Sequence, residues 1–331
     1  MVNLLTIVNF AAGAISILLN LIALSLYPSF IEKGKANGYL LMTFFQFLSD
    51  FVFSIVGVVF RMELAILDHK GKTYVTYYLV YWDGVNISFN LYSFLVFVYF
   101  IFYYLNLTIV TSAVVCRYLL IVKKVNLNQW HFLSIIIFNA VCVIGLNANF
   151  CLSGFDPSIP LDIIYQNDLL VGNNDDLINE HSRSASLPTG FSFFIIPYLA
   201  FFIINFVAIL FAYVQYNSFM IKFSSVMSAS TKKVNEEYLN IIRLQLIVPL
   251  FLSFAPLFTF CWFITLSVQA RYWGSISLVL GSLTPTLTSI LYLGMLTKSR
   301  KILILRFKSI ASRFSDRIEK PVKIITTTGH T

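Results

Sequence analysis

Charge is scarce in this sequence of 331 residues, because only 11% of them are Asp, Glu, Lys or Arg while 58% are hydrophobic. Soluble domains carry about a quarter charged residues, and even large ones keep a polar coat. The scarcity excludes a water-soluble globular domain. The apolar excess must face lipid, so the sequence predicts an integral membrane protein.

Cysteine and histidine are also few, with four residues of each. The cysteines lie in or beside apolar runs without CxxC spacing, and the histidines are isolated, so we expect neither a disulfide framework nor a zinc site. No His/Asp/Glu constellation or Gly-x-Ser-x-Gly elbow stands in an apolar run. We therefore expect neither an enzyme nor a cofactor. The cysteines are Cys116, Cys142, Cys151 and Cys261.

Long apolar runs are what the sequence does contain, and a helix of about 20 apolar residues crosses the bilayer. The first run carries no charge, and Met1, Val2 and Asn3 before it lack the basic residues of a signal peptide, the alternative interpretation. Prolines inside the later runs are tolerated in membrane helices. The seven predicted spans are 4–27, 39–60, 89–122, 130–152, 189–214, 244–268 and 275–296.

Lysine and arginine are distributed unequally between the two sides of these spans. One side, which holds the connections 28–38, 123–129 and 215–243 and the tail, carries 18 of the 23, including Arg117. The other side carries the remaining five, in 61–88, 153–188 and the last outer connection. The positive-inside rule places the first side in the cytoplasm and the N-terminus outside. The net charge of +8 thus indicates membrane orientation and not nucleic-acid binding.

Three segments outside the spans have features of their own. The sequon Asn86-Ile87-Ser88 falls in a predicted outer loop and is a candidate glycosylation site. The acidic loop 153–188 is either a solvated loop or a surface that steers cations. The segment 298–308 mixes basic and apolar residues as an amphipathic helix on the inner leaflet would. We expect a receptor domain over 1–311 and a disordered tail over 312–331.

Polar residues inside predicted spans are costly in lipid and so point to function. Asp50 stands in the middle of the second span, with Asn20 and Asn106 expected at matching depth. Its carboxylate has either a structural role or a coupling role, and it is a candidate site for a sodium ion. Arg117 ends the third span as either an ordinary positive-inside arginine or a switch residue.

Aromatic residues of the third and sixth spans suggest a ligand cavity toward the outer half. Tyr99 and Tyr103 precede Arg117 by 18 and 14 residues, about five and four helical turns, and so share its inward face. We expect Trp262 to line the same cavity. Plain packing is the alternative for all three residues.

Several short motifs resemble those of the rhodopsin-like G-protein-coupled receptors, and more closely the nematode serpentine chemoreceptors of the Srg- and Srv-like groups. Leu19-Asn20-Leu21-Ile22 is similar to the asparagine motif of helix 1, and Leu48-Ser49-Asp50-Phe51 to the aspartate motif of helix 2. Cys116-Arg117-Tyr118 stands where the family has an acid-Arg-aromatic triplet. Pro197, Pro256 and Thr284-Pro285 match the prolines of helices 5, 6 and 7.

The resemblance implies an all-α bundle of seven membrane helices and a plasma-membrane receptor, and by analogy with the family a location in sensory cilia. It implies an external small-molecule ligand, a heterotrimeric G protein as partner, and switch roles for Arg117, Tyr118, Asp50, Asn20, Asn106 and Pro285. Cys116 departs from the family acid that holds the arginine. A small-solute transporter or channel is the alternative function, and a retinal pigment is excluded because 275–296 lacks lysine.

Overall fold

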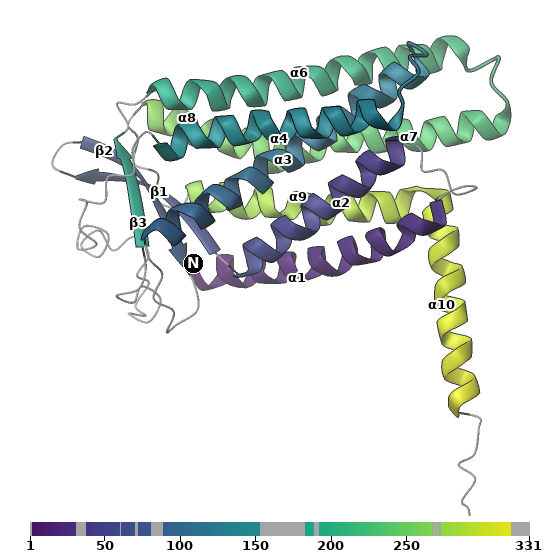
Figure 1. Cartoon of the computed structure of the whole chain (residues 1–331), viewed down its shortest axis with the longest axis horizontal. Helices are drawn as coiled ribbons and strands as arrows, with labels where there is room; N and C mark the ends of the chain where they lie inside the picture. The colour runs from purple at the N-terminus through teal and green to yellow at the C-terminus, as the bar shows by residue number, and fades with distance from the viewer. Residues whose placement is uncertain are drawn as a thin grey trace, which may run out of the picture.

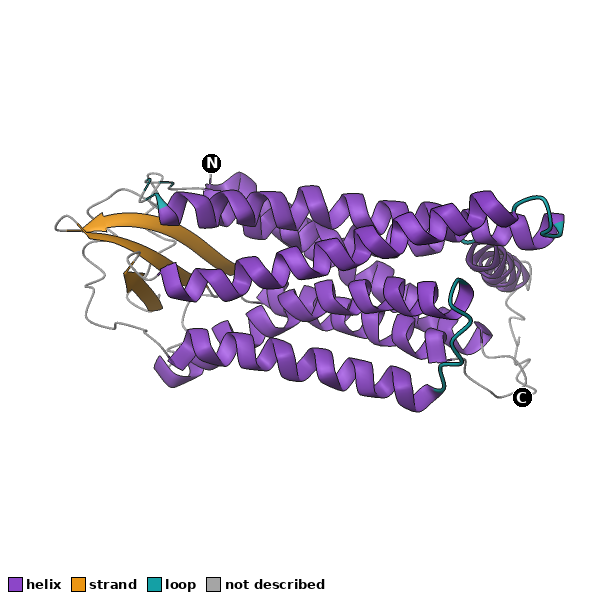
Figure 2. Ribbon diagram, turned by 90° about the horizontal axis from the view of Figure 1, so that it is seen from above, coloured by secondary structure: helices purple, strands orange, loops and turns teal. Residues whose placement is uncertain are grey.

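The computed structural model describes residues 2–30, 38–59, 61–69, 72–80, 89–152, 183–188, 192–266, 268, 270 and 273–318. Within these residues, seven helical segments are long and apolar enough to cross a membrane. They run side by side in one bundle (Figures 1 and 2). The predicted bundle of seven membrane helices is confirmed.

The spans correspond closely to the apolar runs, since a helix satisfies its own backbone groups where lipid offers no partners. The first four are α1 (Val2–Leu26), α2 (Gly38–Val59), α3 (Phe89–Ile121) and α4 (Gln129–Leu152). The last three are α6 (Ser192–Phe223), the sixth span, and α9 (Trp273–Met295). A short helix η1 (Tyr27–Phe30) follows α1.

The sixth span consists of three helical pieces in a row, because two prolines interrupt its hydrogen bonding. The pieces are α7 (Ala229–Pro249), the π-helical turn η2 (Leu250–Phe254) and α8 (Ala255–Thr265). In η2 the Ala255 N–H reaches back to the Leu250 carbonyl, one residue further than in an α-helix. Such π-turns are frequent at functional sites.

The connection predicted over 215–243 is mostly helical, which corrects the sequence analysis. Helix α6 continues to Phe223 and α7 begins at Ala229, where Ser228 Oγ accepts from the Thr231 N–H at 3.2 Å. The helices continue beyond the apolar runs because they bury residues against each other. The Tyr216 hydroxyl, for example, donates to Asn235 Oδ1 at 3.2 Å.

A three-stranded antiparallel sheet, which the sequence analysis did not predict, covers one end of the bundle (Figure 1). Strands β1 (Arg61–His69) and β2 (Lys72–Val80) form a hairpin, and β3 (Arg183–Pro188) pairs with β2. Ile66 of β1 is only 1% exposed and joins the largest buried cluster of the bundle. We call this the sheet end.

The opposite end carries the short connections from α3 to α4 and from α6 to α7, and we call it the basic end. Helix α10 (Thr297–Ile318) starts there and runs across the bundle axis, as the yellow helix in Figure 1 shows. It continues seven residues past the boundary predicted at 311. Its exposed apolar side chains, among them Leu305 and Phe307, suit the predicted surface helix. The rest of the tail lies outside the described residues.

Candidate functional site

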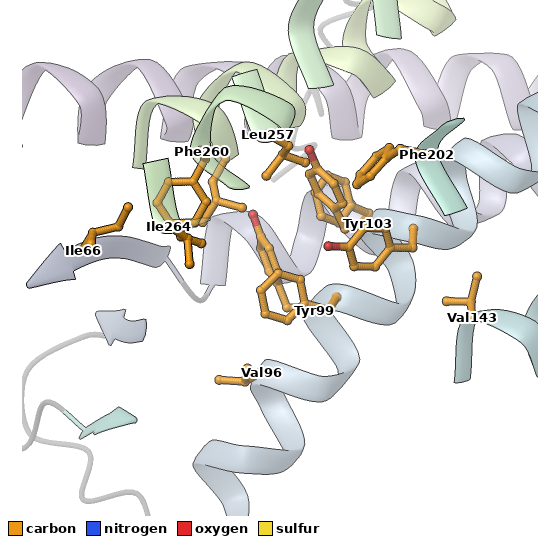
Figure 3. Packing of buried hydrophobic residues seen from close by; sticks show 13 residues of the cluster. Ile66, Val96, Tyr99, Tyr103, Val143, Phe202, Leu257, Phe260 and Ile264 are labelled. Atoms are coloured by element: carbon orange, nitrogen blue, oxygen red, sulfur yellow. The ribbon is translucent and has the colours of Figure 1, made fainter. Parts of the chain in front are cut away.

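A buried aromatic cluster occupies the half of the bundle nearer the sheet end, and α3 supplies its centre (Figure 3). Tyr99 and Tyr103 are 4% and 7% exposed, so both face inward as predicted. The Phe53 ring of α2 lies between them, with centroid distances of 5.4 and 5.8 Å. Helices α6, α8 and α9 close the cluster with Phe202, Leu257, Phe260, Ile264 and Leu278.

A small cavity lies against Tyr103, between α2, α3, α6, the sixth span and α9. Polar atoms reach it from several helices. Ser253 of η2 and Thr284 of α9 are 3.1 Å apart at their hydroxyl oxygens. The Tyr103 hydroxyl and Asn106 Oδ1 are buried and make no hydrogen bond of good geometry among the described residues, although Ser253 lies close to the Tyr103 hydroxyl. Buried polar groups normally have partners, so these two atoms are available to a ligand or to water.

Gly281 of α9 makes room for Tyr103 in this cavity. A Cβ atom at position 281 would lie 2.5 Å from the Tyr103 hydroxyl oxygen and 2.6 Å from the nearest ring carbon. The backbone of α9 therefore approaches the ring as closely as only glycine permits.

Trp262 does not line this cavity, which corrects the prediction. Its side chain is 55% exposed, whereas Phe260 and Ile264 are buried. Two residues along a helix correspond to a rotation of about 200°. Since Phe260 and Ile264 face the core, Trp262 between them faces outward.

Asp50 lies in the middle of the bundle and is 0% exposed. Neither carboxylate oxygen has a hydrogen-bond partner among the described residues. An ionised carboxylate in such a place is strongly disfavoured unless a cation or donors compensate it. The Asp50 carboxylate is therefore a buried group without a partner among the described residues, and a bound cation would compensate its charge.

Asn20 lies near the depth of Asp50 but is bonded elsewhere. Its Nδ2 donates to Ser16, at 2.9 Å to the carbonyl and 3.1 Å to the hydroxyl, and its Oδ1 accepts from Ser289 of α9 at 2.7 Å. Ser54 donates to the Ser16 hydroxyl at 2.7 Å and to the Asp50 carbonyl at 2.6 Å. Asn20 and Asp50 thus each lie one turn from the Ser16–Ser54 contact, without a hydrogen bond between their side chains.

Arg117 lies at the basic end, 8% exposed, and contacts the sixth span. Its guanidinium carbon is 3.1 Å from the centroid of the Tyr238 ring of α7. A cation over an aromatic face is an attractive contact, stronger where water is excluded. Cys116 is buried in a cluster with Met42 and Phe132, and Tyr118 packs edge-on against Phe211 of α6 at 5.8 Å.

A second contact of the sixth span at the basic end was missed by the sequence analysis. Glu237 of α7 accepts two hydrogen bonds from Thr297, the first residue of α10: one from its N–H at 3.2 Å and one from its hydroxyl. Arg300 donates to the same hydroxyl at 3.2 Å. Glu237 and Thr297 are 60 positions apart, and no local motif signals that they meet.

Two predicted functional residues remain, one inside and one outside the described part of the chain. Pro285 lies inside α9, directly after the Thr284 that contacts Ser253. The candidate glycosylation site Asn86 lies outside the described residues. Among the described residues, no group of three or more His, Cys, Asp or Glu could hold a metal ion.

A bundle of seven helices long and apolar enough to cross a membrane defines the class of protein as a multi-pass membrane protein. Residues 177–304 match a family model described as serpentine type 7TM GPCR chemoreceptor Str. The match covers β3, α6, the whole sixth span, α9 and the start of α10. It confirms the predicted similarity to the nematode serpentine chemoreceptors, which are receptors and not enzymes. None of the curated proteins searched matches the chain.

The cavity yields a prediction about ligand response. Gly281→Ala is expected to raise the ligand concentration for half-maximal response by about tenfold, a loss of about 1.4 kcal/mol, because the new methyl group would displace Tyr103. The measurement is a dose–response curve normalised to surface expression. Gly294→Ala is the matched control, since no atom lies within 4 Å of a Cβ at that position of the same helix. If the two substitutions shift the dose–response curve equally, Tyr103 does not contact the ligand.

Proposed function

We propose that this protein is a chemosensory receptor of the plasma membrane that binds an external small molecule and signals to a heterotrimeric G protein. By analogy with the family, the membrane would be that of sensory cilia. The observation that carries the proposal is the pairing of two sites along the same helices. The sixth span and α3 both line the cavity through Ser253 and Tyr103, and both meet again at the basic end through Tyr238 and Arg117.

The ligand would enter from the sheet end and contact Tyr103, Asn106 and the Ser253–Thr284 pair. Its class is a small, mainly apolar molecule with one or two hydrogen-bonding groups, because the cavity wall is aromatic around a few polar atoms. Binding favours whichever helix packing it fits better. The π-turn η2 and Pro285 give the sixth span and α9 places where their direction can change.

The basic end is the cytoplasmic side in this proposal, as loop charge predicts. Movement of α7 would separate Tyr238 from Arg117 and open a surface for the G protein between α3, α6 and α7. The ring contact of Tyr118 with Phe211 joins α3 to α6 without a residue of α7, so this contact would remain while α7 moves.

The direct test is a ligand screen in cells that co-express the receptor with promiscuous G proteins, with intracellular calcium as the readout. A ligand found in this way is then applied to purified receptor and G protein, and nucleotide exchange is measured. Ligand-dependent exchange is the expected result. A bound ligand that changes exchange on no G protein would contradict the signalling half of the proposal.

Asp50 is proposed to hold a sodium ion, with the hydroxyl and amide oxygens around Ser16 and Asn20 nearby. The fit rests on the buried carboxylate without a partner. Sodium would compensate the charge, so it would stabilise the helix packing that buries Asp50.

Sodium is accordingly expected to raise the melting temperature of the purified protein, and Asp50→Asn is expected to remove this dependence. The neutral amide should also make the protein more stable than the wild type when sodium is replaced by choline, because an uncompensated buried charge is costly. Thermal unfolding is followed over a sodium chloride series. Glu236→Gln, which removes an exposed charge on α7, should keep the sodium response. A wild type whose melting temperature is indifferent to sodium would rule out the ion site.

A further inference from the structure

A second and larger cavity lies at the basic end and shares no lining residue with the ligand cavity. It lies between α1, α2, α7, α9 and α10 and is open to the surface on one side. The residues that line it are Ala23, Leu24, Leu26, Tyr27, Thr43, Phe44, Phe47, Tyr238, Tyr292, Leu293, Leu296 and Ser299. The proposed receptor function assigns it no role.

The chemistry of this wall suits a hydrocarbon chain. Seven of the twelve lining side chains contain carbon only, and three of the others are tyrosines that present mostly ring surface. The Tyr292 hydroxyl already accepts from Gln245 Nε2 at 3.4 Å. A charged or strongly polar occupant would lose its hydration here without replacement, whereas each buried CH₂ group would gain about 0.8 kcal/mol.

The surroundings of the cavity are positively charged. Helix α10 contains seven Lys and Arg against one Asp. Its Arg306 lies two turns after the lining residue Ser299 and donates to the Ser25 hydroxyl at 3.1 Å and the Ser25 carbonyl at 3.0 Å. Arg306 also donates to the Ser29 hydroxyl at 3.0 Å. This guanidinium therefore stands at the end of α1, beside lining residues Leu24 and Leu26.

We propose that this cavity binds an acyl chain of an anionic phospholipid from the leaflet at the basic end, with the headgroup held near Arg306. The apolar wall selects the chain, and the charge of Arg306 and α10 selects the anionic headgroup. A free fatty acid has the same chain chemistry, so the experiment separates the two sources. The proposal does not depend on ligand identity or on G-protein coupling.

The test uses the full-length protein in nanodiscs that contain phosphatidylserine with a photoreactive diazirine in the acyl chain. Parallel samples contain phosphatidylcholine with the same chain, or the free photoreactive fatty acid. After irradiation, mass spectrometry of peptides locates the label. The expected result is labelling of lining positions such as Leu24, Phe44 and Leu296, stronger from phosphatidylserine than from the other two probes.

Ala23→Phe fills the cavity and is expected to lower labelling of these positions at least about fivefold, or about 1 kcal/mol. Ala14→Phe is the matched control, because Ala14 is exposed on the same helix and its substitution should change nothing. Thermal unfolding checks that both variants fold, and Thr43→Leu is the second cavity-filling variant if Ala23→Phe does not. Arg306→Gln should remove the preference for phosphatidylserine over phosphatidylcholine, while Lys222→Gln on α6 should keep it.

Three outcomes would overturn the proposal. Label confined to side chains on the bundle surface, such as Ile15 and Leu18, would mean that lipid only surrounds the protein. Unchanged labelling in both cavity-filling variants would mean that the chain lies elsewhere. Labelling by the fatty acid without labelling by either phospholipid would assign the cavity to a free acid instead.

Discussion

Replacing Arg117 by alanine is expected to lower nucleotide exchange at saturating ligand at least about tenfold, or 1.4 kcal/mol, while surface expression changes less than about twofold. Arg117 is the buried cation at the end of α3, and it lies where movement of α7 would expose it to a partner. Basal exchange is a poor readout for this variant, because the same side chain also holds Tyr238. The measurement is therefore ligand-stimulated exchange divided by the amount of receptor.

Arg117→Lys separates charge from shape in this experiment. Lysine keeps the positive charge but lacks the planar guanidinium that stacks on an aromatic ring, so an intermediate loss is expected. Lys301→Ala on α10 is the control, since it removes one exposed positive charge at the same end of the protein. If Arg117→Ala reduces expression and signalling in equal proportion, Arg117 is only a structural residue.

Much of the membrane architecture could be predicted from the sequence, because the thickness of the bilayer fixes the length of an apolar run. The spans of α1, α2, α4 and α9 differ from the predicted runs by only a few residues. The inward positions of Tyr99 and Tyr103 followed from helical periodicity alone. The same periodicity explains why Trp262 does not line the cavity. Phe260 and Ile264 lie about one turn apart and face inward, so Trp262 between them faces outward.

Other features depend on contacts that no local pattern records. The polar outer segments form a sheet because β2 finds partners on both sides, one of which is more than 100 positions away at β3. The ends of α6 and α7 are polar enough to look like a loop, yet they are helical because they pack together. The sequence also indicated Asp50 as unusual, but not that its neighbour Asn20 would bond Ser16 and Ser289 instead.

The contact between Glu237 and Thr297 is of this second kind, and its position gives it a role in the proposed signalling mechanism. Two neighbouring residues hold α7 to two different helices: Tyr238 is stacked under Arg117 of α3, and Glu237 bonds the first residue of α10. The free N–H groups at a helix start favour a negative charge. Outward movement of α7 would break both contacts. Both therefore favour the helix packing seen in the structure, which we call the closed state.

Glu237→Ala is therefore expected to raise exchange in the absence of ligand about tenfold, because losing two charge-assisted hydrogen bonds at a half-buried site weakens the closed state by about 1.4 kcal/mol. Glu236→Ala is the matched control, since it removes the same charge from the adjacent exposed position. Thr297→Val removes one of the two donors, the hydroxyl, and should raise basal exchange by a smaller factor. Added to Glu237→Ala, it should change little further, since the acceptor is already gone. Equal basal exchange in the Glu236 and Glu237 variants would show that the contact between Glu237 and Thr297 does not stabilise the closed state.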